Sequence, residues 1–198
     1  DLMKQSYIYT LAFTLLSTAI VTFVLAGVYT ILQPRIITNQ LQMEQYAILS
    51  AFGIDVADEK QINVLFTQYV AEIQVGDLQV YALRDDTGIT NLALPFTGAG
   101  LWGTIQGYLA VSADLSHITG LEFTKQNETP GLGSRITEAW FKEQFRGIQI
   151  QGTKAVTADA TGEPLINVIT GATSSSNAVL RIINETIESH VAQLEVLL

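Results

Sequence analysis

The sequence contains no cysteine and is poor in basic residues, histidine and proline. Without cysteine, the 198-residue chain can form no disulfide, no thiolate zinc site and no cysteine-ligated iron–sulfur cluster. Lys and Arg number 10 against 19 Asp and Glu, and this balance excludes the basic surface that a nucleic-acid partner requires. The only histidines, His117 and His190, form no local metal-ligand pair. Any redox cofactor must therefore be held through oxygen or nitrogen atoms.

Uncharged residues dominate the N-terminal part of the chain. No charged residue occurs from Gln5 to Pro34, and the stretch from Ile8 to Leu32 is rich in Leu, Ile, Val, Phe and Ala. A helix of about 20 such residues crosses the hydrocarbon core of a membrane. Because the run is longer than that of a signal peptide and no cleavage site follows it, residues 1–33 are predicted to be a transmembrane anchor. Lys4 nearly balances Arg35, so charge counting leaves the orientation open.

A ridge of small, weakly polar residues repeats at every fourth position of this run. Its members are Thr10, Thr14, Thr18, Thr22, Ala26 and Thr30. Small hydroxylated faces allow helices to approach closely in membranes, so the ridge can pack against partner subunits. The threonines can equally satisfy their own helix backbone in lipid. Both interpretations stay open.

The rest of the chain predicts one α+β domain on a stalk. Residues 34–55 have helical spacing and are predicted to form a helical stalk, followed by a domain over residues 56–198. Asp58 is suited to cap a helix that ends near Val70. Strand-like alternation begins at Ile73 and indicates an antiparallel sheet. An amphipathic last helix is expected to begin close to Ser176, so helices flank the sheet.

Gly98 to Gly103 spell G-x-G-x-x-G, the dinucleotide-binding pattern. That pattern requires a helix after the glycines, whereas Thr104 to Val111 alternates like a strand. A turn is therefore predicted here, with Trp102 available to cover a flat ligand or to fill the core. No nucleophile elbow and no phosphate-binding P-loop sequence occurs, so neither hydrolase nor nucleotide-triphosphatase chemistry is supported.

Two further segments carry more information about a binding site. The first, Glu128 to Gly133, reads E-T-P-G-L-G, in which Pro-Gly suits the centre of a type II turn. Taken alone, it is also an ordinary surface turn. The second, Thr170 to Asn177, reads T-G-A-T-S-S-S-N at the start of the last helix. Helix N-termini bind phosphate, whereas simple N-capping would explain only one hydroxyl residue of this string.

Both segments, in this order behind an anchor and a stalk, resemble those of the NqrC and RnfG family, the FMN-binding subunits of Nqr and Rnf complexes. The stretch G-A-G-L-W-G-T-I-Q-G-Y-L-A resembles NqrC in particular. The resemblance covers essentially the whole chain. It implies an electron-transfer subunit of an ion-translocating (Na⁺ or H⁺) NADH:quinone or ferredoxin:NAD oxidoreductase, with no substrate site of its own. Electrons would pass between an iron–sulfur centre and another flavin in partner subunits.

The resemblance also assigns residues. In the family the last Thr of [S/T]-G-A-T carries FMN through a phosphoester that a flavin transferase installs, which points to Thr173. The residues expected to surround the flavin are Glu128, Thr129, Leu132, Gly171 and Ala172, with Ser176 and Asn177 at the phosphate and with Trp102 and Lys154 as weaker candidates. Asn167 stands where the family's transferase motif usually has Asp. The resemblance further implies a single-pass protein of the cytoplasmic (inner) membrane, bound to other membrane subunits, with its FMN domain on the periplasmic or extracytoplasmic side.

Two alternatives remain. One is a membrane-anchored ligand-binding or regulatory module without a redox role. The other is a related flavoprotein of extracytoplasmic electron export or regulation that uses the same flavin domain. The choice between an Nqr and an Rnf complex is also open, as are the electron donor and acceptor and the pumped ion.

Overall fold

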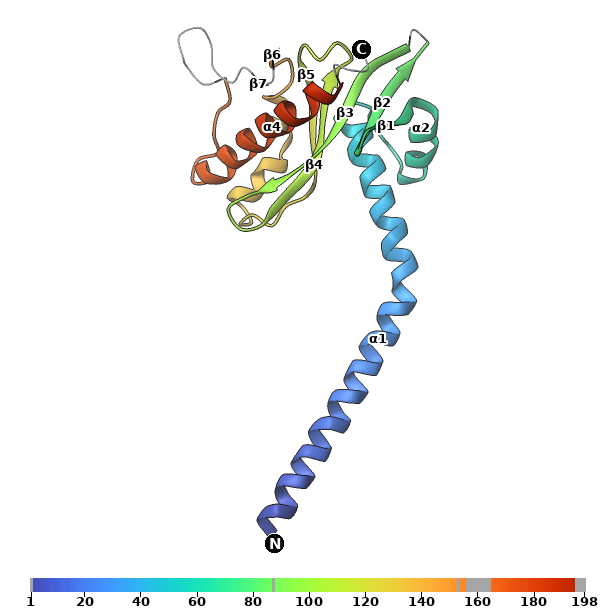
Figure 1. The fold of residues 1–198 in the computed structure, drawn as a ribbon, viewed down its shortest axis with the longest axis vertical. Coiled ribbons are helices and arrows are strands. Elements are labelled where there is room, and N and C mark those ends of the chain that lie inside the picture. Colours follow the sequence, from blue (N-terminus) through green and yellow to red (C-terminus); the bar gives the residue numbers. More distant parts are fainter. Residues whose placement is uncertain (1, 87, 153, 156–164, 195–198) are drawn as a thin grey trace. The chain divides into compact units, whose positions relative to one another are not determined.

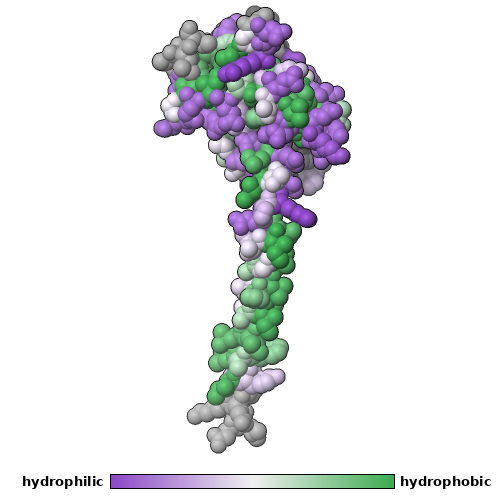
Figure 2. Space-filling view, turned by 90° about the vertical axis from the view of Figure 1, so that its right-hand side faces the viewer, coloured by the Kyte–Doolittle hydropathy of each residue, from purple (hydrophilic) through white to green (hydrophobic). Residues whose placement is uncertain are grey.

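The computed structural model describes residues 2–86, 88–152, 154–155 and 165–194, and the chain divides into two compact units at residues 41 and 42 (Figure 1). Helix α1 (Leu2–Ala51) is continuous and contains Pro34. Its residues up to 41 make up the first unit, and the remainder belongs to the second. By length and composition, α1 can cross a membrane, and Figure 2 shows its apolar surface. The predicted boundary between anchor and stalk stays a prediction.

The threonine ridge of α1 hydrogen-bonds along its own helix. The Thr14 hydroxyl donates to the carbonyl oxygen of Thr10 at 2.7 Å, and that of Thr30 donates to the carbonyl oxygen of Ala26 at 2.8 Å. These bonds agree with the interpretation that the hydroxyls satisfy the helix backbone.

The second unit is built on one antiparallel sheet of five strands in sequence order. The strands are β1 (Val70–Val75), β2 (Leu78–Asp85), β3 (Gly88–Ala99), β4 (Thr104–Ser112) and β5 (Ile118–Lys125). A separate short hairpin pairs β6 (Ile150–Gln151) with β7 (Lys154–Ala155). The prediction of an α+β fold with an antiparallel sheet is confirmed. The glycine pattern is followed by strand β4 and not by a helix, as the alternation of Thr104 to Val111 predicted.

Besides the end of α1, the described residues of the second unit form four short helices and the longer helix α4. They are the 3₁₀ helix η1 (Glu59–Gln61), α2 (Ile62–Tyr69), the 3₁₀ helix η2 (Gly133–Thr137), α3 (Ala139–Glu143) and α4 (Thr173–Leu194). Asp58 caps η1 as predicted, since its carboxylate accepts a hydrogen bond from the Lys60 backbone N–H at 3.0 Å. The predicted start of the last helix near Ser176 was three residues too late. The Ser176 N–H already donates to the carbonyl oxygen of Ala172, so Ser176 lies inside the first turn of α4.

Each face of the sheet buries its own apolar core. On one face, α4, α3 and η2 cover side chains that include Leu94, Leu109 and Leu121. On the other face, α2 and residues 47–52 at the end of α1 pack over Tyr81, Ala93, Tyr108 and Ala110. Because strand side chains alternate between faces, the apolar content of β4 is divided between the two cores.

Glu44 connects the end of α1 to the sheet. Its Oε1 atom accepts hydrogen bonds from the Tyr108 hydroxyl at 2.5 Å and from the Tyr81 hydroxyl at 3.3 Å. The two rings meet edge to face, with centroids 5.6 Å apart. Burial, followed by the Glu44 charge, raises the pKa of Tyr81 to about 12, and burial followed by the hydrogen bond to Glu44 raises the pKa of Tyr108 still further. Both phenols therefore stay protonated and donate to Glu44 throughout the physiological pH range.

Tyr108→Phe tests this connection. We expect the substitution to lower the free energy of unfolding by about 2 kcal/mol, because a hydrogen bond to a charged acceptor is lost inside the fold. Tyr81→Phe is the matched control, since its hydrogen bond is longer, and we expect a smaller loss. The measurement is urea unfolding of the full chain in detergent, followed by tryptophan fluorescence. An equal loss in the two variants would contradict this account of Glu44.

Candidate functional site

Three segments that are distant in sequence converge beside the start of α4. They are the glycine loop (Gly100–Gly103) between β3 and β4, the turn from Glu128 to Gly133, and residues 171–177 at the start of α4. Hydrogen bonds that the Glu128 carboxylate accepts join all three. The sequence indicated the last two segments together and treated the glycine loop as a separate turn.

The turn has the predicted geometry. The Leu132 N–H donates to the carbonyl oxygen of Thr129 at 3.1 Å, and the φ angle of Gly131 is 75°. Pro130 and Gly131 therefore occupy the two central positions of a type II turn, in which the second requires a positive φ. The turn exposes Thr129, Pro130, Gly131 and Leu132 on one side.

Glu128 points into the protein. Its side chain is 4% exposed. Oε1 accepts hydrogen bonds from the backbone N–H groups of Leu101 at 2.9 Å and Trp102 at 3.1 Å, and Oε2 accepts one from the Ser175 hydroxyl at 2.5 Å. Both carboxylate oxygens are thus occupied by donors from the protein.

The first turn of α4 presents exposed hydroxyl groups. Thr173 is the first residue of the helix, and it is exposed together with Ser174 and Asn177. Gly171 precedes it with a φ of 79°, and a Cβ atom there would lie 3.3 Å from Leu132 Cδ2. The start of α4 therefore lies directly against the turn.

The converging segments also expose three large apolar side chains. Leu101 is 56% exposed, Trp102 is 69% exposed and Leu132 is 44% exposed. Large exposed apolar side chains that gather in one place mark binding surfaces. The first N–H groups of a helix lack partners within the helix and attract phosphate. An apolar, aromatic surface beside a helix N-terminus with exposed hydroxyl groups fits a flat aromatic group that carries a phosphate.

Two predicted residues lie apart from these exposed groups. Ser176 is fully buried, and its hydroxyl accepts from the Ile169 N–H at 3.0 Å and donates to the carbonyl oxygen of Ala172 at 3.1 Å. It holds the chain before α4 in position. Lys154 precedes Ala155, whose N–H donates to Asn184 at 3.0 Å. Asn184 lies about 16 Å along the helix from Thr173. Lys154 therefore lies beside the middle of α4 and away from Thr173.

The remaining predicted residues come together. Glu128, Thr129, Leu132, Gly171, Ala172, Thr173, Asn177 and Trp102 belong to the three converging segments, with Ala172 buried at 7% exposure. Sequence reasoning missed Leu101 and Ser175 as individual residues. Ser175 belonged to the hydroxyl-rich string, but nothing in the sequence indicates that it faces Glu128. Asn167 lies just before the site, where its backbone N–H donates to the Gln144 side chain at 2.7 Å.

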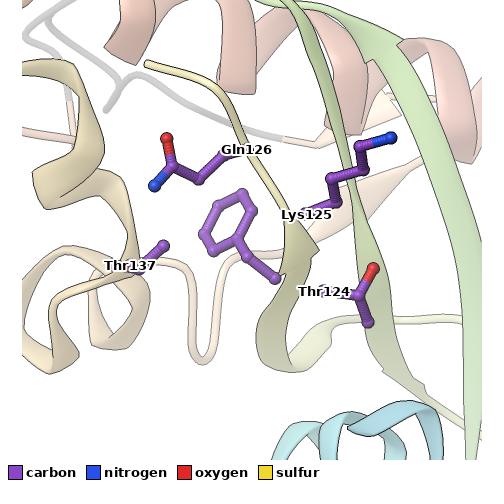
Figure 3. Close-up of a pocket in the computed structure, with 5 residues that line it drawn as sticks. Thr124, Lys125, Gln126 and Thr137 are labelled. Atoms are coloured by element: carbon purple, nitrogen blue, oxygen red, sulfur yellow. The ribbon is translucent and has the colours of Figure 1, made fainter. Parts of the chain in front are cut away.

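A shallow pocket of about 310 Å³ lies at the end of β5 (Figure 3). Phe123, Thr124, Lys125, Gln126 and Thr137 line it. The Gln126 side chain also accepts a hydrogen bond from the Glu128 N–H at 2.7 Å. The pocket therefore borders the turn, but Thr173 is not among its lining residues. Within the described residues, no group of His, Asp and Glu is arranged to hold a metal ion.

The sequence of this chain is similar to those of known proteins. Residues 100–188 match the model of the FMN-binding domain family. The chain is 35% identical over 114 residues to the C subunit of the Na⁺-translocating NADH-quinone reductase of Pasteurella multocida, covering 51% of this chain and 42% of that protein. It is 39% identical over 90 residues to the corresponding protein of Chlamydia pneumoniae, covering 44% and 28%. The chain thus spans less than half the length of these curated relatives.

Solved structures share the fold. The crystal structure of the C subunit of the Na⁺-translocating NADH-quinone reductase from Parabacteroides distasonis superposes with a TM-score of 0.68 at 23% identity, covering 81% of this chain and 96% of that chain. That of NqrC from Shewanella oneidensis superposes with a TM-score of 0.62 at 19% identity, covering 75% and 95%.

Proposed function

We propose that this chain, whose residues 100–188 match the FMN-binding domain family, is a subunit of the NqrC and RnfG type that holds FMN through a phosphoester on Thr173 and passes electrons within a membrane-bound, ion-translocating oxidoreductase. The observation that carries the proposal is the exposed Thr173 at the first residue of α4, directly after the T-G-A segment and beside the Pro-Gly turn.

The residues have distinct parts in this proposal. On the transferase, the Thr173 hydroxyl oxygen would bond to phosphorus and lose its proton, while the bond from that phosphorus to the leaving group of an activated FMN donor breaks. The attached phosphate would lie at the positive end of the α4 dipole, which favours its negative charge. Leu132 and Trp102 would contact the ring, while Thr129 would offer polar atoms and Gly171 would leave room for close approach. Asn177, one helical turn after Thr173, lies within reach of the phosphate.

Electron transfer requires little further chemistry from the protein itself. When bound, FMN supplies the redox chemistry, and the chain has to hold the ring, exclude water from part of it and leave an edge accessible to a partner. The exposure of Leu101, Trp102 and Leu132 is consistent with such an accessible site. No general base is needed.

The partners and the location follow from the same proposal. The length and composition of α1 support an anchor in the cytoplasmic membrane. The curated relatives are named as subunits of a Na⁺-translocating NADH-quinone reductase, which supports Na⁺ as the ion and other membrane subunits as partners. An iron–sulfur centre and a second flavin in those subunits would exchange electrons with this chain. A flavin transferase would form the ester, and the FMN domain would lie on the extracytoplasmic side.

The proposal is tested by denaturing the purified protein in acid after production together with a flavin transferase. We expect a yellow, fluorescent flavin to precipitate with the polypeptide, because an ester survives the loss of the fold. A flavin that stays in the supernatant would contradict the covalent bond. A colourless protein from the same cells would favour a membrane-anchored ligand-binding module instead.

A further inference from the structure

We infer that Glu128 and Ser175 form a clamp that positions the glycine loop (Gly100–Gly103) against the start of α4. In this role Glu128 is a positioning residue and its carboxylate does not contact the ligand. That the fixed loop serves as a side wall for FMN rests on the proposed function, whereas the clamp itself belongs to the protein alone.

The hydrogen bonds of Glu128 carry the inference. One carboxylate oxygen accepts from the backbone N–H groups of Leu101 and Trp102, and the other accepts from the Ser175 hydroxyl. The carboxylate therefore bridges two segments that are separated by more than 70 residues in the sequence. Hydrogen bonds to a carboxylate are shorter and stronger than those between neutral groups.

Two glycines make the space that the clamp needs. A Cβ atom on Gly100 would lie 2.4 Å from Glu128 Oε1, and one on Gly133 would lie 2.5 Å from Ser175 Oγ and 3.0 Å from Glu128 Oε2. Neither glycine is among those with a positive φ, so their backbone conformation does not require glycine. Glycine is required at these positions because a side chain would collide with Glu128 or Ser175. These glycines let the loop, the turn and the helix approach one carboxylate.

The clamp determines where Leu101 and Trp102 lie. Within the loop, the Gly100 N–H donates to the carbonyl oxygen of Gly103 at 2.7 Å, which closes the tip. The bonds to Glu128 then join the tip to Ser175, two residues after Thr173. Two large apolar side chains are thus held next to the start of α4 before any ligand arrives. A preformed wall reduces the entropy lost on ordering the site around a ligand.

Hydrogen exchange of the full chain in detergent tests the clamp, with Thr173→Ala present in every sample so that no covalent flavin contributes. In Glu128→Ala, we expect the amides of Leu101 and Trp102 to exchange about tenfold faster or more, because both lose a charged acceptor. Glu128→Gln keeps one acceptor oxygen for these amides and should restore most of the protection. The matched control Glu188→Ala removes an exposed carboxylate from α4 and should change nothing in the loop.

The inference would be overturned if the hydrogen-exchange rates of the Leu101 and Trp102 amides were unchanged in a folded Glu128→Ala protein. A rise in exchange rate spread evenly over the whole domain would overturn it as well. If Glu128→Ala does not fold, Ser175→Ala decides, since it removes one contact and should raise exchange in the loop about threefold or more. No rise in Ser175→Ala would equally overturn the inference. Because flavin is absent from these samples, a failed clamp and a failed flavin attachment are separate results.

Discussion

Thr173→Ala is expected to abolish covalent flavin binding completely. The substitution removes the only oxygen to which the proposed ester is formed, while alanine, the best helix former, keeps the start of α4 intact. When the variant is produced together with a flavin transferase, its band on a denaturing gel should show no flavin fluorescence. Its thermal unfolding should stay close to that of the unmodified protein, because the side chain at 173 is exposed.

Neighbouring hydroxyl groups provide the matched controls for this result. Ser174 is exposed one residue further along α4, and Ser174→Ala should keep the full fluorescence. Thr173→Ser retains a hydroxyl at the same position and should keep part of it. If Thr173→Ala kept its fluorescence and Ser174→Ala lost it, the acceptor would be Ser174 and the proposed assignment would be wrong.

Gly120→Ala is expected to destabilise the domain by about 3 kcal/mol, the upper part of the usual range for overpacking a core. A Cβ atom at Gly120 would lie 2.0 Å from the carbonyl oxygen of Ala51, at the end of α1. Backbone atoms cannot move aside as a flexible side chain can, so the end of α1 must shift from the sheet. Thermal unfolding of the full chain in detergent, followed by circular dichroism, measures the effect.

The shift should also disturb a buried ion pair beside Gly120. Lys142 Nζ lies 2.6 Å from Glu122 Oε2, and the Ser50 hydroxyl of α1 donates to the same carboxylate at 2.6 Å. Gly27→Ala is the matched control, because nothing lies within 4 Å of the added Cβ atom. We expect no change in the unfolding of the domain in that variant. Equal unfolding temperatures for the two variants would show that α1 does not pack on Gly120 as described.

Local signals allowed part of the site to be predicted from the sequence. The turn at Thr129 to Leu132 is encoded by adjacent residues, since Pro130 fixes φ and Gly131 allows a positive φ. The hydroxyl-rich string before the last helix likewise indicated a helix start, although the helix begins at Thr173 and not near Ser176. The turn and the helix start are each determined by a few adjacent residues, so a local sequence pattern can predict them.

The parts that the sequence did not reveal depend on contacts between distant segments. The burial of Glu128 follows from donors 26, 27 and 47 residues away, which no local pattern encodes. The pattern of β3 likewise does not mark it as a strand inside the sheet, because it contains Pro95 and polar residues, and proline normally argues against a central strand. Only the family resemblance suggested Lys154 as a flavin neighbour, and its position beside the middle of α4 follows from how β7 packs on that helix.

Tandem mass spectrometry of the peptide that spans residues 165–181, taken from protein matured with a flavin transferase, tests the covalent attachment of FMN directly. We predict one FMN ester per chain, with fragment ions that assign the added mass to Thr173. An unmodified peptide, in protein that is folded and was exposed to an active transferase, would contradict it.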